Sequence, residues 1–203
     1  MIDLNSLALY KKKIISYIDE NVLTFPTQSK INSLFNEVHK YKIVIFNKPT
    51  KGGYYNLSSM SKLKLFRNDQ ELTIKSISSS DIWNATAILT DGEQDYTVKL
   101  VGDSVYEKRS SCSVGNAFNS GWLSYIGPNN MTLEFEMDNL TKISYVAGHY
   151  SDYRIIANNN TITVFCDDEQ IYSKNTIIPN GTNTSQIHIN FNDYDDVNVT
   201  YTV

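Results

Sequence analysis

Histidine and cysteine are the residue types best suited to nucleophilic or metal chemistry, and in this chain they are few and far apart. The three histidines are His39, His149 and His188. No two of them stand at a metal-binding spacing such as H-E-x-x-H. Neither Cys112 nor Cys166 lies in a nucleophile motif. We therefore expect no catalytic residue, no resident metal, no cofactor and two unpaired structural thiols, with a single disulfide as the alternative.

Two acidic turns offer oxygen ligands of the kind that Ca²⁺ prefers. One is Asp167-Asp168-Glu169, and the other holds Asp193, Asp195 and Asp196. The spacing of an EF-hand loop is absent from both segments. The expected role of each segment is therefore a solvated hairpin turn.

Aromatic and charged residues in loops carry the chemistry of ligand recognition. A flat ring stacks on the face of a sugar, and neighbouring amides or charges fix its hydroxyl groups. The densest such segment spans residues 149–154. Each ring has an alternative role at the edge of the core. The predicted ligand-binding residues are Tyr54, Tyr55, Trp83, Arg109, Tyr150, Asp152, Tyr153 and Arg154.

Composition and charge narrow the class of partner. The chain has 203 residues, of which 18 are Lys or Arg and 22 are Asp or Glu. Apart from Lys11-Lys12-Lys13 the basic residues are scattered, so we expect no surface that follows nucleic-acid phosphates. No apolar run is long enough to cross a membrane. The start, Met1-Ile2-Asp3, lacks the pattern of a signal peptide, which favours release by another route, such as cell lysis with a virus particle.

The N-terminal residues predict helices. Asp3 is a candidate N-cap for a helix over residues 3–20. Apolar positions spaced by three and four form a seam interrupted by one lysine. A helix this short is marginal alone, so it packs either on its own domain or in an assembly, with self-association or anchoring favoured. A second, weaker helix is expected from about Ser29 to His39. The seam comprises Leu4, Leu7, Lys11, Ile14 and Ile18.

From Tyr41 onward the apolar pattern changes to a period of two, which indicates β-strands. In residues 131–137 the apolar and polar side chains alternate, as expected for an antiparallel sheet with one buried face. The number and spacing of strands favour a mainly β, antiparallel jelly-roll sandwich at 41–203, preceded by a helical segment at 1–40. The other expected strands are 42–46, 62–66 paired as a hairpin with 71–77, 96–100, 162–166, 187–191 and 197–203.

Three segments resemble the discoidin-type (coagulation factor 5/8 C-terminal) family of galactose-binding-like jelly rolls. They are Tyr41–Phe66, with its Gly52-Gly53-Tyr54-Tyr55 loop, then Ser113–Trp122, and Thr161–Asp168. The resemblance covers about 160 residues, and it implies a jelly roll that binds glycans. Asn119 stands where the family has Asp, so the calcium that the family often holds there is not carried over. In the family, the position of Trp122 is structural.

Residues 7–19 are similar to the N-terminal helices of bacteriophage fibre and baseplate proteins, which trimerise or anchor an outer domain. Together the two resemblances imply a virion structural protein, such as a head fibre, tail fibre or baseplate component. Such a protein would be a non-enzymatic homotrimer that contacts other virion proteins through its helix and a host-surface glycan through its jelly roll. It would be located in the virion and be extracellular after host lysis. The alternatives are a stand-alone carbohydrate-binding module or adhesin, and a virion protein without a ligand.

Overall fold

The computed structural model describes nine segments of the chain. These are residues 37–49, 57–80, 83–102, 114–119, 123–126, 129–148, 157–177, 184–192 and 195–202. The predicted N-terminal helix and its seam lie outside them. The chain comprises two compact units, Met1–Val38 and His39–Val203, and the sandwich described below belongs to the second unit.

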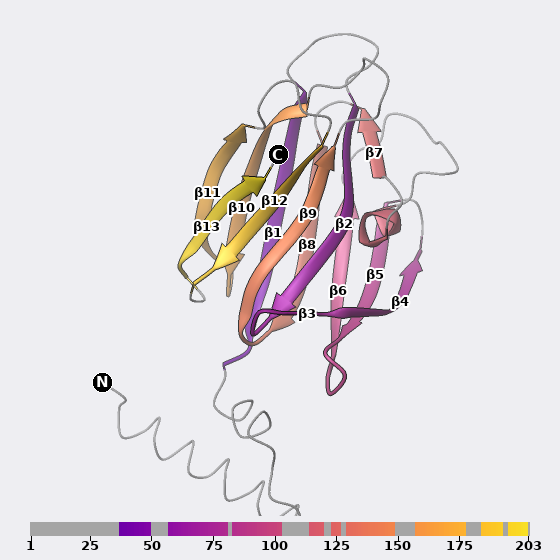
Figure 1. Ribbon diagram of the computed structural model, residues 1–203, viewed down its shortest axis with the longest axis vertical. Helices are drawn as coiled ribbons and strands as arrows, with labels where there is room; N and C mark the ends of the chain where they lie inside the picture. Colours follow the sequence, from indigo (N-terminus) through magenta and orange to yellow (C-terminus); the bar gives the residue numbers. More distant parts are fainter. Residues whose placement is uncertain are drawn as a thin grey trace, which may run out of the picture. The chain divides into compact units, whose positions relative to one another are not determined.

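Two antiparallel sheets form a β-sandwich (Figure 1). The first sheet has the order β11-β10-β1-β8-β6-β5-β4. The second has the order β13-β12-β9-β2-β3, and β7 also pairs with β2. The first sheet comprises β1 (His39–Pro49), β4 (Thr73–Ser79), β5 (Asn84–Thr90), β6 (Asp95–Gly102), β8 (Asn129–Met137), β10 (Ala157–Cys166) and β11 (Glu169–Ile177). The second comprises β2 (Leu57–Arg67), β3 (Gln70–Glu71), β7 (Leu123–Ile126), β9 (Leu140–Gly148), β12 (Thr184–Phe191) and β13 (Val197–Thr202).

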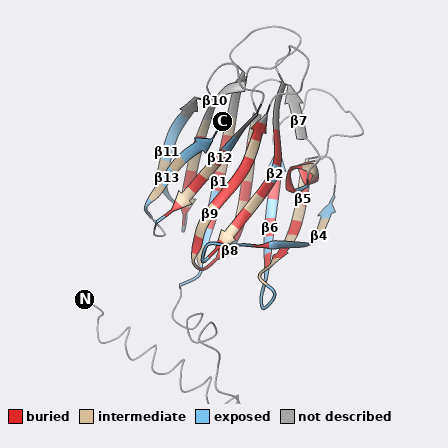
Figure 2. Cartoon of the chain, viewed as in Figure 1, coloured by how far each residue is buried: buried red, intermediate tan, exposed pale blue. Residues whose placement is uncertain are grey.

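The core lies between the sheets and is built mainly from alternate residues of the inner strands, whereas the described residues of β3, β4, β11 and β13 are partly or fully exposed (Figure 2). Strand β8 confirms the predicted alternation, since Met131, Leu133, Phe135 and Met137 are buried while Glu136 is exposed. The inward phase of β10 is also as predicted, because Ile162, Val164 and Cys166 are buried. These patterns confirm a mainly β sandwich of antiparallel sheets.

A short 3₁₀ helix, η1 (Val114–Phe118), fills part of the space between the sheets. Its Ala117 and Phe118 are buried. The next residue, Asn119, accepts a hydrogen bond from the Lys62 N–H at 3.0 Å. Within this segment of the discoidin resemblance, Val114, Ala117 and Phe118 therefore pack as part of the core.

The predicted hairpin between 62–66 and 71–77 is only partly correct. Strand β2 does turn at Asn68 and Asp69, but only Gln70 and Glu71 pair with it. From Thr73 the chain crosses to the first sheet and pairs with β5. The second half of the predicted hairpin is thus an edge strand of the opposite layer.

The predicted end of the second helix at His39 is wrong. Glu37 and Val38 have no regular structure, and His39 is the first residue of β1, opposite Met137 of β8. Val38 is 56% exposed, so it does not contribute to a packed helical face. Pairing with β8 decides the conformation of His39.

The hydroxyl of Tyr145 provides a stability test. The residue is 1% exposed on β9, and within the described part of the chain its hydroxyl has no hydrogen-bond partner. A buried polar group without a partner costs free energy. Tyr145→Phe is therefore expected to raise the free energy of unfolding by about 1 kcal/mol, measured by chemical denaturation. A loss of similar size would mean that the hydroxyl has a partner in solution.

Candidate functional site

Strand register brings the connections with predicted ligand-binding residues to one end of the sandwich. Pro49, the last residue of β1, lies opposite Ala157, the first of β10. Gly148, the last residue of β9, pairs with Ser59 near the start of β2 and with Thr184 at the start of β12. We call this the loop end. The connections 50–56, 103–113, 149–156 and 178–183 all leave strands there.

Of the predicted ligand-binding residues, Trp83 is the one that lies in the described part of the chain. Its carbonyl oxygen accepts a hydrogen bond from Gly102 N–H at 2.9 Å, which fixes it beside the end of β6 at the loop end. Its side chain is half-buried. The other predicted residues belong to connections at the same end and lie outside the described residues: Tyr54, Tyr55, Arg109, Tyr150, Asp152, Tyr153 and Arg154.

The opposite end of the sandwich, which we call the turn end, is closed by short hairpins. Positive φ angles occur there at Asn68, Asp69, Asn139, Asp167 and Asp168. Asn and Asp tolerate this left-handed conformation, which two-residue hairpins require. The predicted turn at Asp167 and Asp168 is confirmed. The chain also enters the sandwich at this end, through His39.

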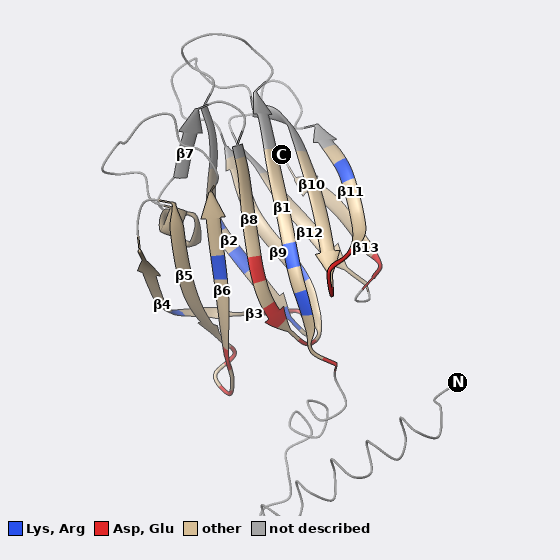
Figure 3. Cartoon of the chain, turned by 180° about the vertical axis from the view of Figure 1, so that it is seen from behind, with Lys and Arg blue, Asp and Glu red and all other residues tan. Residues whose placement is uncertain are grey.

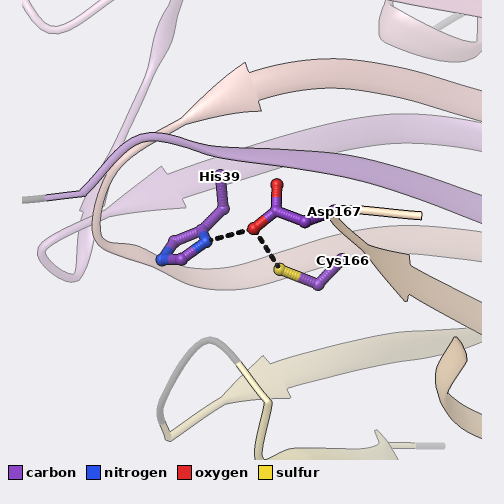
Figure 4. A group of neighbouring side chains, drawn as sticks. All are labelled: His39, Cys166 and Asp167. Carbon is purple, nitrogen blue, oxygen red and sulfur yellow. Dashed lines mark hydrogen bonds and ion pairs between the residues drawn. The ribbon is translucent and has the colours of Figure 1, made fainter. Parts of the chain in front are cut away.

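A cluster of three metal-ligating side chains lies at the turn end (Figure 4). His39 Nδ1 is 2.7 Å from Asp167 Oδ2, and the Cys166 thiol donates to the same oxygen at 3.9 Å. All three ligand atoms lie within 4.8 Å of one another. Antiparallel pairing of Tyr41 with Cys166 joins the start of β1 to the end of β10 and creates the cluster. We call it the His-Cys-Asp cluster.

The electrostatics of the cluster oppose thiol chemistry in the absence of a cation. The hydrogen bond from His39 lowers the pKa of Asp167, and the bond from the Lys40 N–H at 2.9 Å lowers it further. Burial, followed by the charge of Asp167, raises the pKa of Cys166 to about 11. The thiol is therefore protonated at neutral pH and points at a carboxylate, whereas a catalytic cysteine needs a base that removes its proton.

Sequence reasoning recognised each member separately but missed the cluster. Cys166 was correctly expected to be buried, and within the described residues it is a free cysteine. Cys112, the other thiol, lies outside those residues. The sequence feature that could have indicated the cluster is that Cys166, on the buried face of its strand, directly precedes the acidic turn. The missing information was the partner strand, because His39 is 128 positions from Asp167.

A second polar cluster at the turn end is structural. Arg67 donates from Nε and Nη2 to Asp138 at 2.9 and 2.6 Å, and from Nη1 to Asp91 at 3.1 Å. Asp91 Oδ1 also accepts the backbone N–H groups of Glu93 and Gln94. The guanidinium thereby joins the end of β2 to the β8–β9 and β5–β6 turns. We call this the Arg67 cluster.

None of the helices in the described part of the chain has the length and hydropathy needed to cross a bilayer. No family model, no curated protein and no solved structure matches the chain.

Proposed function

We propose that the chain is a non-enzymatic structural protein of a bacteriophage virion, namely a head fibre, tail fibre or baseplate component. In this proposal the N-terminal segment anchors or trimerises the protein. The sandwich, with a discoidin-like jelly-roll topology, binds a host-surface glycan. The glycan would contact the residues at the loop end, including Trp83, Tyr150 and Tyr153.

The polarity of the sandwich is the observation that supports this proposal. The chain enters at the turn end, where His39 lies opposite Met137, while the connections that carry the predicted ligand residues leave from the loop end. A domain that is attached to a virion at one end and binds a glycan at the other end would hold the glycan away from the particle. β-Sandwiches usually bind their ligands through loops that a rigid pair of sheets holds in place.

The charge pattern supports a partner other than nucleic acid. On the outer face of the first sheet, Lys42 and Lys99 lie on either side of Glu134 (Figure 3). The interleaved signs do not form the continuous basic stripe that follows a phosphate backbone. A protonated thiol at Cys166 likewise supports a non-catalytic role.

Alanine substitutions at opposite ends of the sandwich test the location of binding. Asp152→Ala and Tyr153→Ala are expected to weaken glycan binding about tenfold or more, because each removes a sugar contact at the loop end. Glu93→Ala, in the exposed β5–β6 turn at the turn end, is the control and should leave affinity unchanged. The measurement is binding of the full chain to an array of bacterial surface glycans, followed by calorimetry on the best ligand.

Light scattering of the full chain, with and without residues 1–38, tests the anchoring part. The proposal expects a trimer that dissociates when the segment is removed. A monomer in both forms, together with unchanged glycan binding, would instead indicate a stand-alone carbohydrate-binding module. A stable trimer that binds nothing on the array would indicate a virion protein without a ligand.

A further inference from the structure

We propose that the His-Cys-Asp cluster is a zinc site that fastens the start of β1 to the β10–β11 turn. Its ligands would be Nδ1 of His39, the thiolate of Cys166 and Oδ2 of Asp167. The site goes beyond the proposed function, since it lies at the turn end, away from the predicted glycan-binding residues. It is also a site that the spacing of histidines in the sequence did not predict.

The geometry of the three atoms is close to that of a zinc shell. Zinc bonds to sulfur at about 2.3 Å and to nitrogen and oxygen at about 2.0–2.2 Å, so tetrahedral ligands are roughly 3.3–3.6 Å apart. Here the nitrogen and oxygen are 2.7 Å apart and the sulfur and oxygen 3.9 Å apart. Side-chain movements of about 1 Å would complete the shell. Thiolate, imidazole and carboxylate together favour zinc over calcium or magnesium, which prefer oxygen ligands.

The surroundings hold the ligands and admit the ion. Asp167 Oδ1 accepts the Lys40 N–H at 2.9 Å, which orients the carboxylate as outer contacts do in zinc proteins. The Asp167 side chain is 56% exposed, so an ion can reach it, while His39 is only 13% exposed. Asp195, in the β12–β13 turn, acts on the Cys166 thiol through its charge, which adds to the negative potential that attracts a cation. A water molecule would supply the fourth ligand, beside the exposed Asp167 side chain.

When the ion binds, the thiol proton is released to solvent and a zinc–sulfur bond forms, without any change of oxidation state. The ion would join residues 128 positions apart at the point where the chain enters the sandwich. It would therefore hold the first residue of β1 against the β10–β11 turn. The expected consequence is a thermal midpoint that rises with zinc concentration.

The experiment uses the full chain without a histidine tag, treated with EDTA and titrated with zinc chloride or cobalt chloride. Zinc should raise the thermal midpoint, and cobalt should give the near-ultraviolet absorption of a thiolate–cobalt bond. Cys166→Ser and His39→Gln should lose both responses. Cys112→Ser and His188→Gln replace the same residue types elsewhere in the chain. Both control variants should retain the rise in thermal midpoint with zinc and the thiolate–cobalt absorption.

Asp167→Asn separates metal binding from folding. Asn tolerates the φ of 49° at this turn position and keeps an oxygen that can accept the Lys40 N–H, so the variant should fold, although it loses the stabilisation from the charged contact with His39. Its zinc affinity, measured by calorimetry, should fall at least about tenfold. Asp168→Asn, at the next turn position with a φ of 68°, is the matched control and should bind normally. Equal losses in the two variants, no response of the parent to zinc, or a cobalt–thiolate signal that survives Cys166→Ser would overturn the proposal.

Discussion

Replacement of Arg67 by methionine is expected to lower the free energy of unfolding by about 3–5 kcal/mol, because it removes the guanidinium that pairs with the buried carboxylate of Asp138 and the partly buried one of Asp91. Arg67 is 9% exposed and Asp138 is 3% exposed. The two form a paired contact through Nε and Nη2 at 2.9 and 2.6 Å. Asp91 would lose the third donor at 3.1 Å. Chemical denaturation of the two proteins measures the difference.

An exposed ion pair between β2, the strand that carries Arg67, and β3 provides the control. Lys64 contacts Glu71 at 2.8 Å, but both side chains are more than 40% exposed. Lys64→Met should therefore change stability by no more than about 1 kcal/mol. Replacing both Arg67 and Asp138 by apolar residues should recover part of the loss, since no unpaired charge remains between them. A loss below about 1 kcal/mol for Arg67→Met would show that solvent reaches these carboxylates.

The local part of the fold could be predicted because it depends on nearest-neighbour patterns. Alternation in residues 131–137 identified both the strand and its buried face, and the positive φ angles at Asp167 and Asp168 agree with a turn predicted from residue type. Pairing over long distances could not be predicted in this way. The pattern of residues 71–77 does not specify which sheet they join: Glu71 pairs with β2, whereas the pairing of Thr73–Ser79 with β5 depends on contacts beyond the segment. The same limit explains why His39 was assigned to a helix.

The candidate sites follow the same division. Aromatic loop residues could be identified from the sequence, but their common location at the loop end depends on the register of β1 with β10 and of β9 with β12. Asp167 was visible as part of an acidic turn. Its contact with His39 depends on the pairing of β1 with β10, which composition and spacing do not specify. Side chains from three separate turn-end segments likewise meet at Arg67.

Tyr41→Ala should strongly destabilise the core at the turn end, with a loss of about 3–5 kcal/mol in the free energy of unfolding. Tyr41 is 2% exposed. Its ring stacks on Phe135 of the same sheet at 5.4 Å between centroids and meets Phe191 of the opposite sheet edge-on at 5.6 Å. Removing the ring leaves a cavity that both sheets line, and strands held by their neighbours cannot close it.

Substitution of the neighbouring Lys42 is the control for the loss of the Tyr41 ring. Lys42 is exposed on the outer face of β1, and its contact with Glu134 is long at 3.9 Å, so Lys42→Ala should cost no more than about 1 kcal/mol. Tyr41→Phe keeps the ring contacts and should retain most of the stability, which separates packing from the contribution of the hydroxyl. If Tyr41→Phe lost as much as Tyr41→Ala, the hydroxyl rather than the ring would hold the two sheets together here. If the contact between the two sheets forms late in folding, Tyr41→Ala removes packing from the native state but not from the transition state. The variant should then unfold faster in denaturant-jump experiments, with little change in its folding rate.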